Sequence, residues 1–241
     1  MTTFDNPIPA PTGKHALHGL WQTVGFPERF FASPLRASYA IVPLVVLALV
    51  KIALIRAQLP YVVQAIFRTL PESVAAQYAH NPASLLEGRM WLQYAGGVVT
   101  PVLTVTVMAG LLYLVSLSLG HLCRFTNLFV AAAYGWLIYG LKAIFTFVLL
   151  TLRGLDSISG PESLQPALGL GLVFPDGSPA FRMLVDTVNL FDLWFVFVVT
   201  IAIHKSEKLD AKTAAAIAAG SALVFHGFRI GFVYLFQQVV G

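Results

Sequence analysis

Four ionisable side chains lie inside long apolar runs of the sequence, where charges are rare. They are Lys51, Lys142, Asp192 and Arg229. A charge at the centre of a bilayer costs at least about 2.5 kcal/mol, so such residues usually face a protein interior and one another. At about 1.5 Å per residue, all four fall roughly 16–25 Å from the end of each run that we expect to be cytoplasmic. We therefore expect one intramembrane charge cluster.

Three polar residues share helical faces with these charges, each three positions away along the chain. The pairs are Tyr139 with Lys142, Asn189 with Asp192, and His226 with Arg229. One carboxylate against three cations leaves a formal surplus of +2. Either a lysine is deprotonated or reaches water, or an anion completes the site.

The cluster has two interpretations. It is a pocket for an anionic lipid headgroup, a substrate or a proton-coupled solute, or else Asp192 is a structural brace paired with Lys142 or Arg229. A third alternative is that the depths are misjudged. The sequence leaves these alternatives open.

Motifs for enzyme chemistry are not found. The sequence has no nucleophile elbow, Walker A loop, HExxH pair or CxxC pair. His15 and His18 are three residues apart but are more simply surface histidines than metal ligands. The single cysteine, Cys123, excludes an intramolecular disulfide and is expected to be a free thiol. We predict no catalytic activity, no metal and no cofactor.

The composition indicates an integral membrane protein. Hydrophobic residues make up 57% of the chain and charged residues 11%, and the mean hydropathy is +0.77. A soluble domain usually carries about 25% charged residues, so lipid must be the solvent for much of this chain. The pI near 9.3 reflects basic residues spread over membrane-flanking segments, so nucleic acid is not an expected partner.

The fold class predicted is all-α: a polytopic bundle of five transmembrane helices. Residues 1–36 would form a cytoplasmic segment and residues 37–241 the membrane domain. Five runs reach the roughly 20 apolar residues needed to cross a bilayer. They are 38–58, 93–119, 127–151, 184–203 and 213–237. The stretch 60–70 is too short to span.

Local features refine this picture. Gly96, Gly97 and Pro101 predict a kink or a frayed first turn in the second run. Gly227 and Gly231 form a GxxxG pattern suited to packing against another helix or another copy of the chain.

Two segments are predicted outside the spans. Apolar residues recur at helical spacing in 17–31, which predicts an amphipathic interfacial helix stopped by Gly25 and Pro27. The stretch 152–183 is rich in Gly, Pro and Ser and reads as an outside loop, in which 167–174 is a candidate re-entrant segment.

Orientation follows from the basic residues of the connections. With the N-terminus inside, the cytoplasmic segments would hold seven of them and the outside segments five. The inside set is Lys14, Arg29, Arg36, Arg124, Lys205, Lys208 and Lys212, and the outside set is Arg56, Arg68, Arg89, Arg153 and Arg182. We predict a cytoplasmic N-terminus and an outside C-terminus.

Two segments resemble a known family. "TVNLFDLWFVFVVTIAIHKSEKL", with Phe191, Asp192 and Trp194, is similar to the fourth span of the bacterial branch of the Yip family, the Ypt/Rab-interacting five-span membrane proteins. "GLWQTVGFPERFFASPLRASYAIVPLVV", with Pro27 and Phe30, resembles that family's approach to its first span, and "SLQPAL" fits its outside loop.

The resemblance implies a five-helix domain in a bacterial inner membrane, with its N-terminus in the cytoplasm and its C-terminus outside. Eukaryotic members act in membrane trafficking with Rab-type GTPases through a longer N-terminal region, so a GTPase partner is not expected for this chain. We therefore expect a membrane-organising or scaffold protein that binds partners or lipids. The alternative is a small transporter or lipid-translocating protein that uses the charge cluster as its site.

Overall fold

The computed structural model describes residues 27–32, 35–78, 80–81, 84–164 and 189–240. Every regular element in these ranges is helical, in agreement with the predicted all-α class. The long helices are α3 (Ile41–Thr69), α6 (Met90–Ser118), α7 (Phe125–Arg153), α9 (Leu190–Glu207) and α10 (Ala211–Val240). The short ones are α2 (Pro27–Phe31), α4 (Glu72–Tyr78), α5 (Ser84–Glu87), and the 3-10 turns η1 (Ala37–Ala40), η2 (Leu155–Ser157) and η3 (Pro161–Leu164).

Four segments of the described chain are long and apolar enough to cross a membrane. They are Ala37–Thr69, Met90–Ser118, Phe125–Arg153 and Ala211–Phe232. The chain is therefore a multi-pass, helical protein by the length and composition of its helices. α9 is not among the four, because its 18 residues include three charged ones, Asp192, Lys205 and Glu207.

The predicted five-span count is thus confirmed for four runs and not for 184–203. Only the part of that run from Asn189 onward is described, and there the helix begins at Leu190. Residues 184–188 lie outside the described part of the chain.

The first span is longer than predicted. α3 continues through Pro60 to Thr69, so 60–70 is not a separate short run but the last turns of the same helix. A proline inside a helix removes one backbone hydrogen bond, and the apolar turns on both sides maintain the helix across it.

Helix α6 has no frayed start. Gly96, Gly97 and Pro101 all lie within an uninterrupted helix that begins at Met90. A Cβ atom added at Gly97 would lie 3.1 Å from the Cδ1 atom of Ile55 on α3. This glycine therefore permits a close approach of α3 and α6 rather than disrupting the helix.

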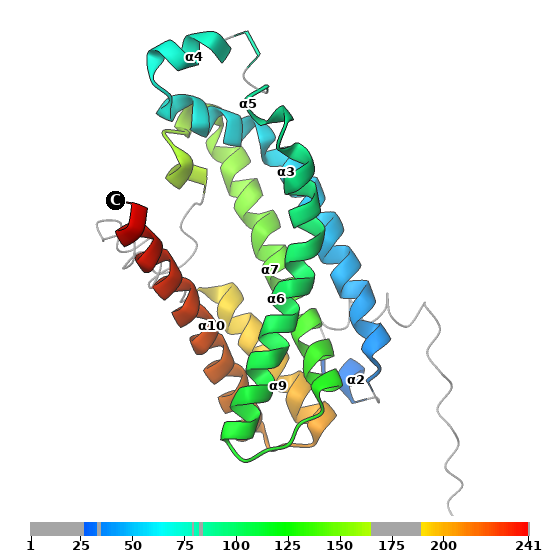
Figure 1. The fold of residues 1–241 in the computed structure, drawn as a ribbon. Helices are drawn as coiled ribbons and strands as arrows, with labels where there is room; N and C mark the ends of the chain where they lie inside the picture. The colour runs from blue at the N-terminus through cyan, green and yellow to red at the C-terminus, as the bar shows by residue number, and fades with distance from the viewer. Residues whose placement is uncertain (1–26, 33–34, 79, 82–83, 165–188, 241) are drawn as a thin grey trace, which may run out of the picture.

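The long helices form one elongated bundle (Figure 1). α9 packs extensively against both α7 and α10, and α3 and α6 pack against each other and against α7. Helices α4 and α5 lie at one end of the bundle, and the connections α6–α7 and α9–α10 lie at the other (Figure 1). α9 runs from the latter end only to about mid-height, because it is much shorter than its neighbours.

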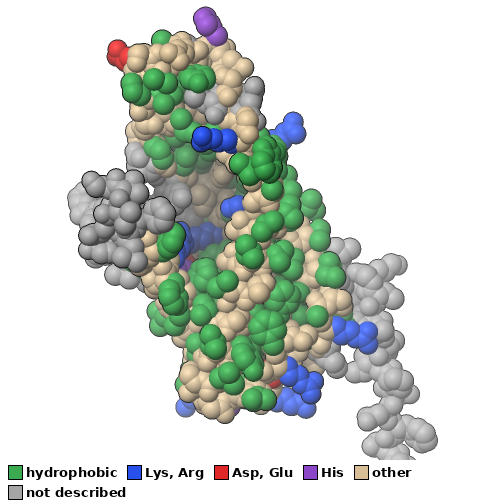
Figure 2. Space-filling view, viewed as in Figure 1, with side chains coloured by type: hydrophobic (Ala, Val, Ile, Leu, Met, Phe, Trp, Pro, Cys, Tyr) green, Lys and Arg blue, Asp and Glu red, His purple; other side chains and the backbone are tan. Residues whose placement is uncertain are grey.

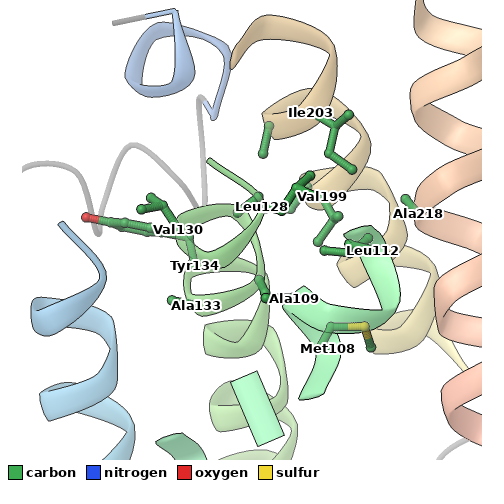
Figure 3. Packing of buried hydrophobic residues seen from close by; sticks show 14 of the residues in the cluster. Met108, Ala109, Leu112, Leu128, Val130, Ala133, Tyr134, Val199, Ile203 and Ala218 are labelled. Atoms are coloured by element: carbon green, nitrogen blue, oxygen red, sulfur yellow. The ribbon is translucent and has the colours of Figure 1, made fainter. Parts of the chain in front are cut away.

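The apolar core fills one half of the bundle. Side chains of α6, α7, α9 and α10 converge there, as Figure 3 shows for Met108, Leu112, Leu128, Val199 and Ala218. On α7 nearly every side chain from Asn127 to Ile138 is buried, and the next buried one is Leu150. We call the part between the α6–α7 connection and Asp192 the packed half, and the part beyond Asp192, toward α4 and α5, the open half.

The open half has a much smaller core. Ala65, Leu150 and Ile158 are buried together there, with Tyr61 and Leu164 packed against them. Ile158 belongs to the described start of the predicted outside loop 152–183, which contains η2 and η3. The predicted re-entrant segment 167–174 lies outside the described residues.

The segment before the first span is described only from Pro27 onward. Residues 17–26 of the predicted interfacial helix lie outside the described part, and Pro27 begins the short helix α2. Proline suits a first helical position because its missing N–H has no intrahelical partner there. Phe31 is fully buried, with its ring 5.9 Å from that of Tyr134, and the Phe30 ring is 4.5 Å from Tyr134. The described part of this segment is therefore packed into the protein.

Candidate functional site

The site begins with the first turn of α9. The backbone of Asn189 is extended, and its side-chain Oδ1 accepts hydrogen bonds from the backbone N–H groups of Phe191 (3.0 Å) and Asp192 (3.1 Å). Asn189 is thus the N-cap of α9. The side chains of Asn189 and Asp192 meet, as their three-residue spacing predicts, but Asn189 stands at the start of the helix and not within it.

Asp192 is the centre of a hydrogen-bonded cluster. Its Oδ1 atom accepts a hydrogen bond from the Tyr139 hydroxyl at 2.6 Å and lies 3.1 Å from Nε2 of His226. Its Oδ2 atom lies 3.3 Å from Nζ of Lys142 and also accepts a hydrogen bond from the Asn189 side-chain amide. A carboxylate has about four lone-pair sites, so four donors satisfy it fully.

The cluster joins three helices at mid-height. Tyr139 and Lys142 lie near the middle of α7, His226 lies near the middle of α10, and Asp192 is in the first turn of α9. The Asp192 side chain is 10% exposed and that of Lys142 is 24% exposed. The first turn of a helix favours a carboxylate, since the helix dipole is positive there. Position, donors and dipole together explain how an aspartate is tolerated at this depth.

The Tyr139 ring connects the cluster to the packed half. Lys142 Nζ lies 5.8 Å from its centroid, the Phe195 ring lies 5.2 Å away, and the Trp136 ring lies 4.6 Å away. The phenol therefore has an apolar face against the core and a hydroxyl directed at the carboxylate of Asp192. This arrangement fixes the position of the donor.

Two of the four predicted charges do not join the ion pair. Lys51 and Arg229 are exposed, and neither has an ion pair within the described residues. The Lys51 side chain runs past Gly97 of α6, on the α3 side of the bundle. Arg229 lies on α10, one turn beyond His226. The structure therefore brings Lys142 and Asp192 together, whereas Lys51 and Arg229 lie exposed at separate places on α3 and α10.

The space beside the cluster is open on one face. Figure 2 shows a hollow between α10 and α6, with Lys and Arg side chains lying inside it. α7 and α10 both pack against α9, and they also meet directly where the Trp136 ring lies 5.4 Å from the Phe225 ring and the Tyr139 hydroxyl lies 3.4 Å from Nε2 of His226. Basic side chains at mid-height thus border a concave surface.

Gly135 of α7 and the GxxxG pair of α10 have opposite surroundings. A Cβ atom at Gly135 would lie 2.6 Å from Cγ2 of Val199 and 2.9 Å from Cε2 of Phe195, so this glycine lets α9 press against α7. At Gly227 and Gly231 an added Cβ atom would meet nothing within 4 Å. No helix in the described part of this chain packs on the GxxxG face, and pairing with a second copy stays a prediction.

The sequence contains a signal that would have located the start of α9. Asn189-Leu190-Phe191-Asp192 has an N-cap residue followed three positions later by an acid, which is typical of a helix N-terminus. The hydrophobicity of the surrounding run obscured it.

Glu207, which is not among the predicted site residues, has a clear structural role. Glu207, the last residue of α9, accepts hydrogen bonds from the backbone N–H of Arg124 (3.1 Å) and the side chain of Asn127 (2.6 Å). It thereby caps the N-terminus of α7 from another helix. Only the tertiary structure brings these residues together, since 80 positions or more separate them.

Neither metal-binding groups nor similarity to known proteins assigns a function to the site. Among the described residues no group of three or more His, Cys, Asp or Glu side chains is placed to hold a metal ion. The free Cys123 is buried, and burial raises the pKa of its thiol. No family profile, curated protein or solved structure matches the chain.

Proposed function

We propose that this chain is a non-enzymatic, multi-pass membrane protein that binds an anionic group at the Asp192 cluster, as a small transporter or lipid-translocating protein. The observation that carries the proposal is the position of the cluster at the start of α9, halfway along α7 and α10 and beside a hollow lined with basic side chains. Ionisable residues at such depth commonly mark substrate or ion pathways. Helices that begin at the membrane midplane are typical of transporter binding sites.

The balance of charges supports an anionic ligand. Lys142 and Asp192 form one ion pair, and Asp192 already accepts hydrogen bonds from all the donors that it can hold. Arg229, one turn beyond His226, has no acidic partner among the described residues. Its guanidinium can bind a phosphate or carboxylate group through two parallel hydrogen bonds. An anion bound there would offset the remaining positive charge.

A membrane-organising or scaffold role is the second candidate. The observation that favours it is the full satisfaction of the Asp192 carboxylate by partners from α7, α9 and α10. Such a cluster can fix the register of three helices without binding any ligand. In that case the basic hollow would have no occupant.

A double-mutant cycle separates the two roles of the ion pair. Asp192→Asn, Lys142→Met and the double variant are purified in nanodiscs and their thermal stability is measured. If the single changes destabilise and the double variant recovers, the pair is a brace. If the single variants keep wild-type stability, the pair does not hold the fold together.

Arg229→Met tests the binding role directly. We expect wild-type stability, because Arg229 is exposed and has no ion pair among the described residues, together with a loss of bound anionic lipid or solute. Arg153→Met, at the end of α7, is the matched control. Equal retention of anionic lipid and of sulfate by wild type and Arg229→Met would favour the scaffold role.

The same proposal includes a five-span, Yip-type topology with a cytoplasmic N-terminus in a bacterial inner membrane. Support comes from the resemblance, from the four apolar helices and from α9 as a fifth helix of the same bundle. The ends of α3, α7, α9 and α10 that carry Arg36, Arg124, Lys205 and Lys212 also lie at one end of the bundle. An alkaline phosphatase fused after Gly241 should be active, since this enzyme matures only outside the cytoplasm. An inactive fusion would reverse the orientation.

A further inference from the structure

We propose that anion binding at this site is linked to the uptake of a proton by the imidazole of His226. This inference rests on the proposed anion-binding function and adds the regulation of the same site. Its basis is the contact of His226 with the Asp192 carboxylate, one helical turn from Arg229, which has no ion pair among the described residues.

The geometry assigns the tautomer of His226. Its Nε2 atom lies 3.1 Å from Oδ1 of Asp192, and a carboxylate only accepts hydrogen bonds. Nε2 therefore carries a hydrogen in the neutral ring, and Nδ1 is the basic nitrogen. Proton uptake would occur at Nδ1 and leave the hydrogen bond to Asp192 intact. The site can thus gain a charge without losing its framework.

Each element around His226 contributes a defined set of ionisable groups. α9 supplies Asp192, and α7 supplies Tyr139, whose hydroxyl oxygen lies 3.4 Å from Nε2, as well as Lys142. α10 itself supplies Arg229, one turn away. α6 also packs on α10, and it has no ionisable side chain between Tyr94 and Tyr113.

His226 is the one histidine in this set. Histidine is the side chain whose ordinary pKa lies in the physiological range, whereas lysine and arginine keep their charge there. With Lys142 and Asp192 cancelling, the site carries one formal positive charge from Arg229 when the imidazole is neutral and two when it is protonated. The difference is one charge directly beside the hollow.

The direction of the linkage follows from this charge. A protonated His226 attracts an anion more strongly, and a bound anion must by reciprocity favour protonation. Binding should therefore be tighter at low pH, by roughly tenfold between pH 8.0 and pH 5.5, within the range of ordinary coupling between sites. The ligand class is an oxyanion that remains charged over this range, either a lipid phosphodiester or a free anion.

Sulfate is the probe for the free anion, because it does not titrate between pH 5.5 and pH 8.0. Binding to the full chain in phosphatidylcholine nanodiscs is measured by calorimetry at both pH values. Two buffers of different ionisation enthalpy give the number of protons taken up. We expect tighter binding and net proton uptake at the lower pH, provided that the free anion is the ligand.

The lipid arm uses nanodiscs that contain phosphatidylglycerol. If a lipid headgroup is the ligand, native mass spectrometry should detect retained phosphatidylglycerol, with less retained at pH 8.0 than at pH 5.5. Sulfate would then bind weakly or not at all in these discs. This comparison identifies the source of the oxyanion.

His226→Gln should abolish the pH dependence of binding and the proton uptake, since glutamine retains a donor for Asp192 but cannot be protonated. His80→Gln, at an exposed position between α4 and α5, should behave as wild type. The wild-type proton count needs no variant, so it remains decisive if His226→Gln fails to fold.

The possible failures are distinguishable. Binding of neither sulfate nor phosphatidylglycerol at any pH would overturn the proposed anion-binding function itself. Binding that is equally tight at pH 5.5 and pH 8.0, with no proton uptake, would overturn only the proton linkage. A pH dependence that survives in a folded His226→Gln variant would assign the proton to a different group and likewise overturn the inference.

Discussion

The two halves of the bundle differ in what lies between α7 and α10. In the packed half α9 fills that space, and Phe195, Val198 and Ile203 are fully buried against both neighbours. In the open half α9 is absent, and large apolar side chains such as Phe145 and Phe228 are exposed. The polar cluster lies at the boundary between the two halves.

This difference indicates that the packed half fixes the position of the cluster and that the open half gives access to it. Close packing fixes side-chain positions to within fractions of an ångström, whereas a loosely packed region can admit water or a ligand. Asp192 and its donors are held from one side by the packed half and face the open half on the other. Such a site has a rigid base and is accessible to a ligand. Substitutions in the two halves should therefore have very different effects on stability.

The largest expected effect comes from removing a ring in the packed half. Phe195→Ala should lower the free energy of unfolding by about 3 kcal/mol, because it leaves a cavity among Gly135, Trp136 and Tyr139. Denaturant titration in mixed micelles measures the loss. Phe197→Ala, two residues away and 57% exposed, should have little effect. Equal losses at both positions would remove the distinction between packed and lipid-facing sides of α9.

A smaller effect is expected from adding a methyl group at the α7–α9 contact. Gly135→Ala should cost about 2 kcal/mol, since the new Cβ would lie 2.6 Å from Val199 and force the helices apart. The same measurement on Gly110→Ala, where nothing lies within 4 Å, should show no loss. An unchanged stability of Gly135→Ala would contradict the close approach of α7 and α9.

The end of the packed half can be weakened by neutralising its inter-helix cap. Glu207→Gln should cost about 1 kcal/mol, because the N-terminus of α7 loses a negative charge that accepts the Arg124 N–H. Hydrogen exchange at the first turn of α7 should accelerate, while exchange at the first turn of α6 serves as the internal control. Acceleration in both helices would point to global destabilisation instead.

The smallest effect concerns the cap of α10. Hydrogen bonds from the Thr213 hydroxyl and backbone N–H hold the pKa of Asp210 below its ordinary value of 3.8. A lowered folded pKa means that this contribution to stability is complete above the unfolded pKa and is lost as the pH falls through the folded value. Wild type should therefore be slightly more stable than Asp210→Ala at pH 7, and the difference should shrink below about pH 4. A melting-temperature difference that stays constant from pH 7 to pH 3 would exclude a charged cap.

Much of the fold is predictable from the sequence because lipid imposes a simple requirement. Helices must satisfy their own backbone hydrogen bonds in a bilayer, so apolar length alone located α3, α6, α7 and α10. Their boundaries were less accurate, as the extension of α3 through Pro60 illustrates. A proline is a weak stop signal in a helix whose apolar turns continue on both sides.

The candidate site was only partly predictable. The helical faces correctly associated Lys142 with Tyr139, and their meeting with Asp192 was one of the alternatives that the sequence left open. Equal depth suggested one cluster of all four charges, whereas Lys51 and Arg229 are exposed and have no ion pair among the described residues. Depth specifies one coordinate only, whereas an ion pair also depends on the rotation and neighbours of each helix.

The sequence by itself determined that this chain is helical and apolar, and that a few charges lie inside its apolar runs, where burial costs free energy. The tertiary structure alone decided that α9 starts at Leu190, that Asp192 takes His226 and Tyr139 as partners, and that Glu207 caps α7. The physical reason is that apolar periodicity and charge cost act along each segment separately. Which donor reaches which acceptor depends on how helices distant in sequence pack against one another.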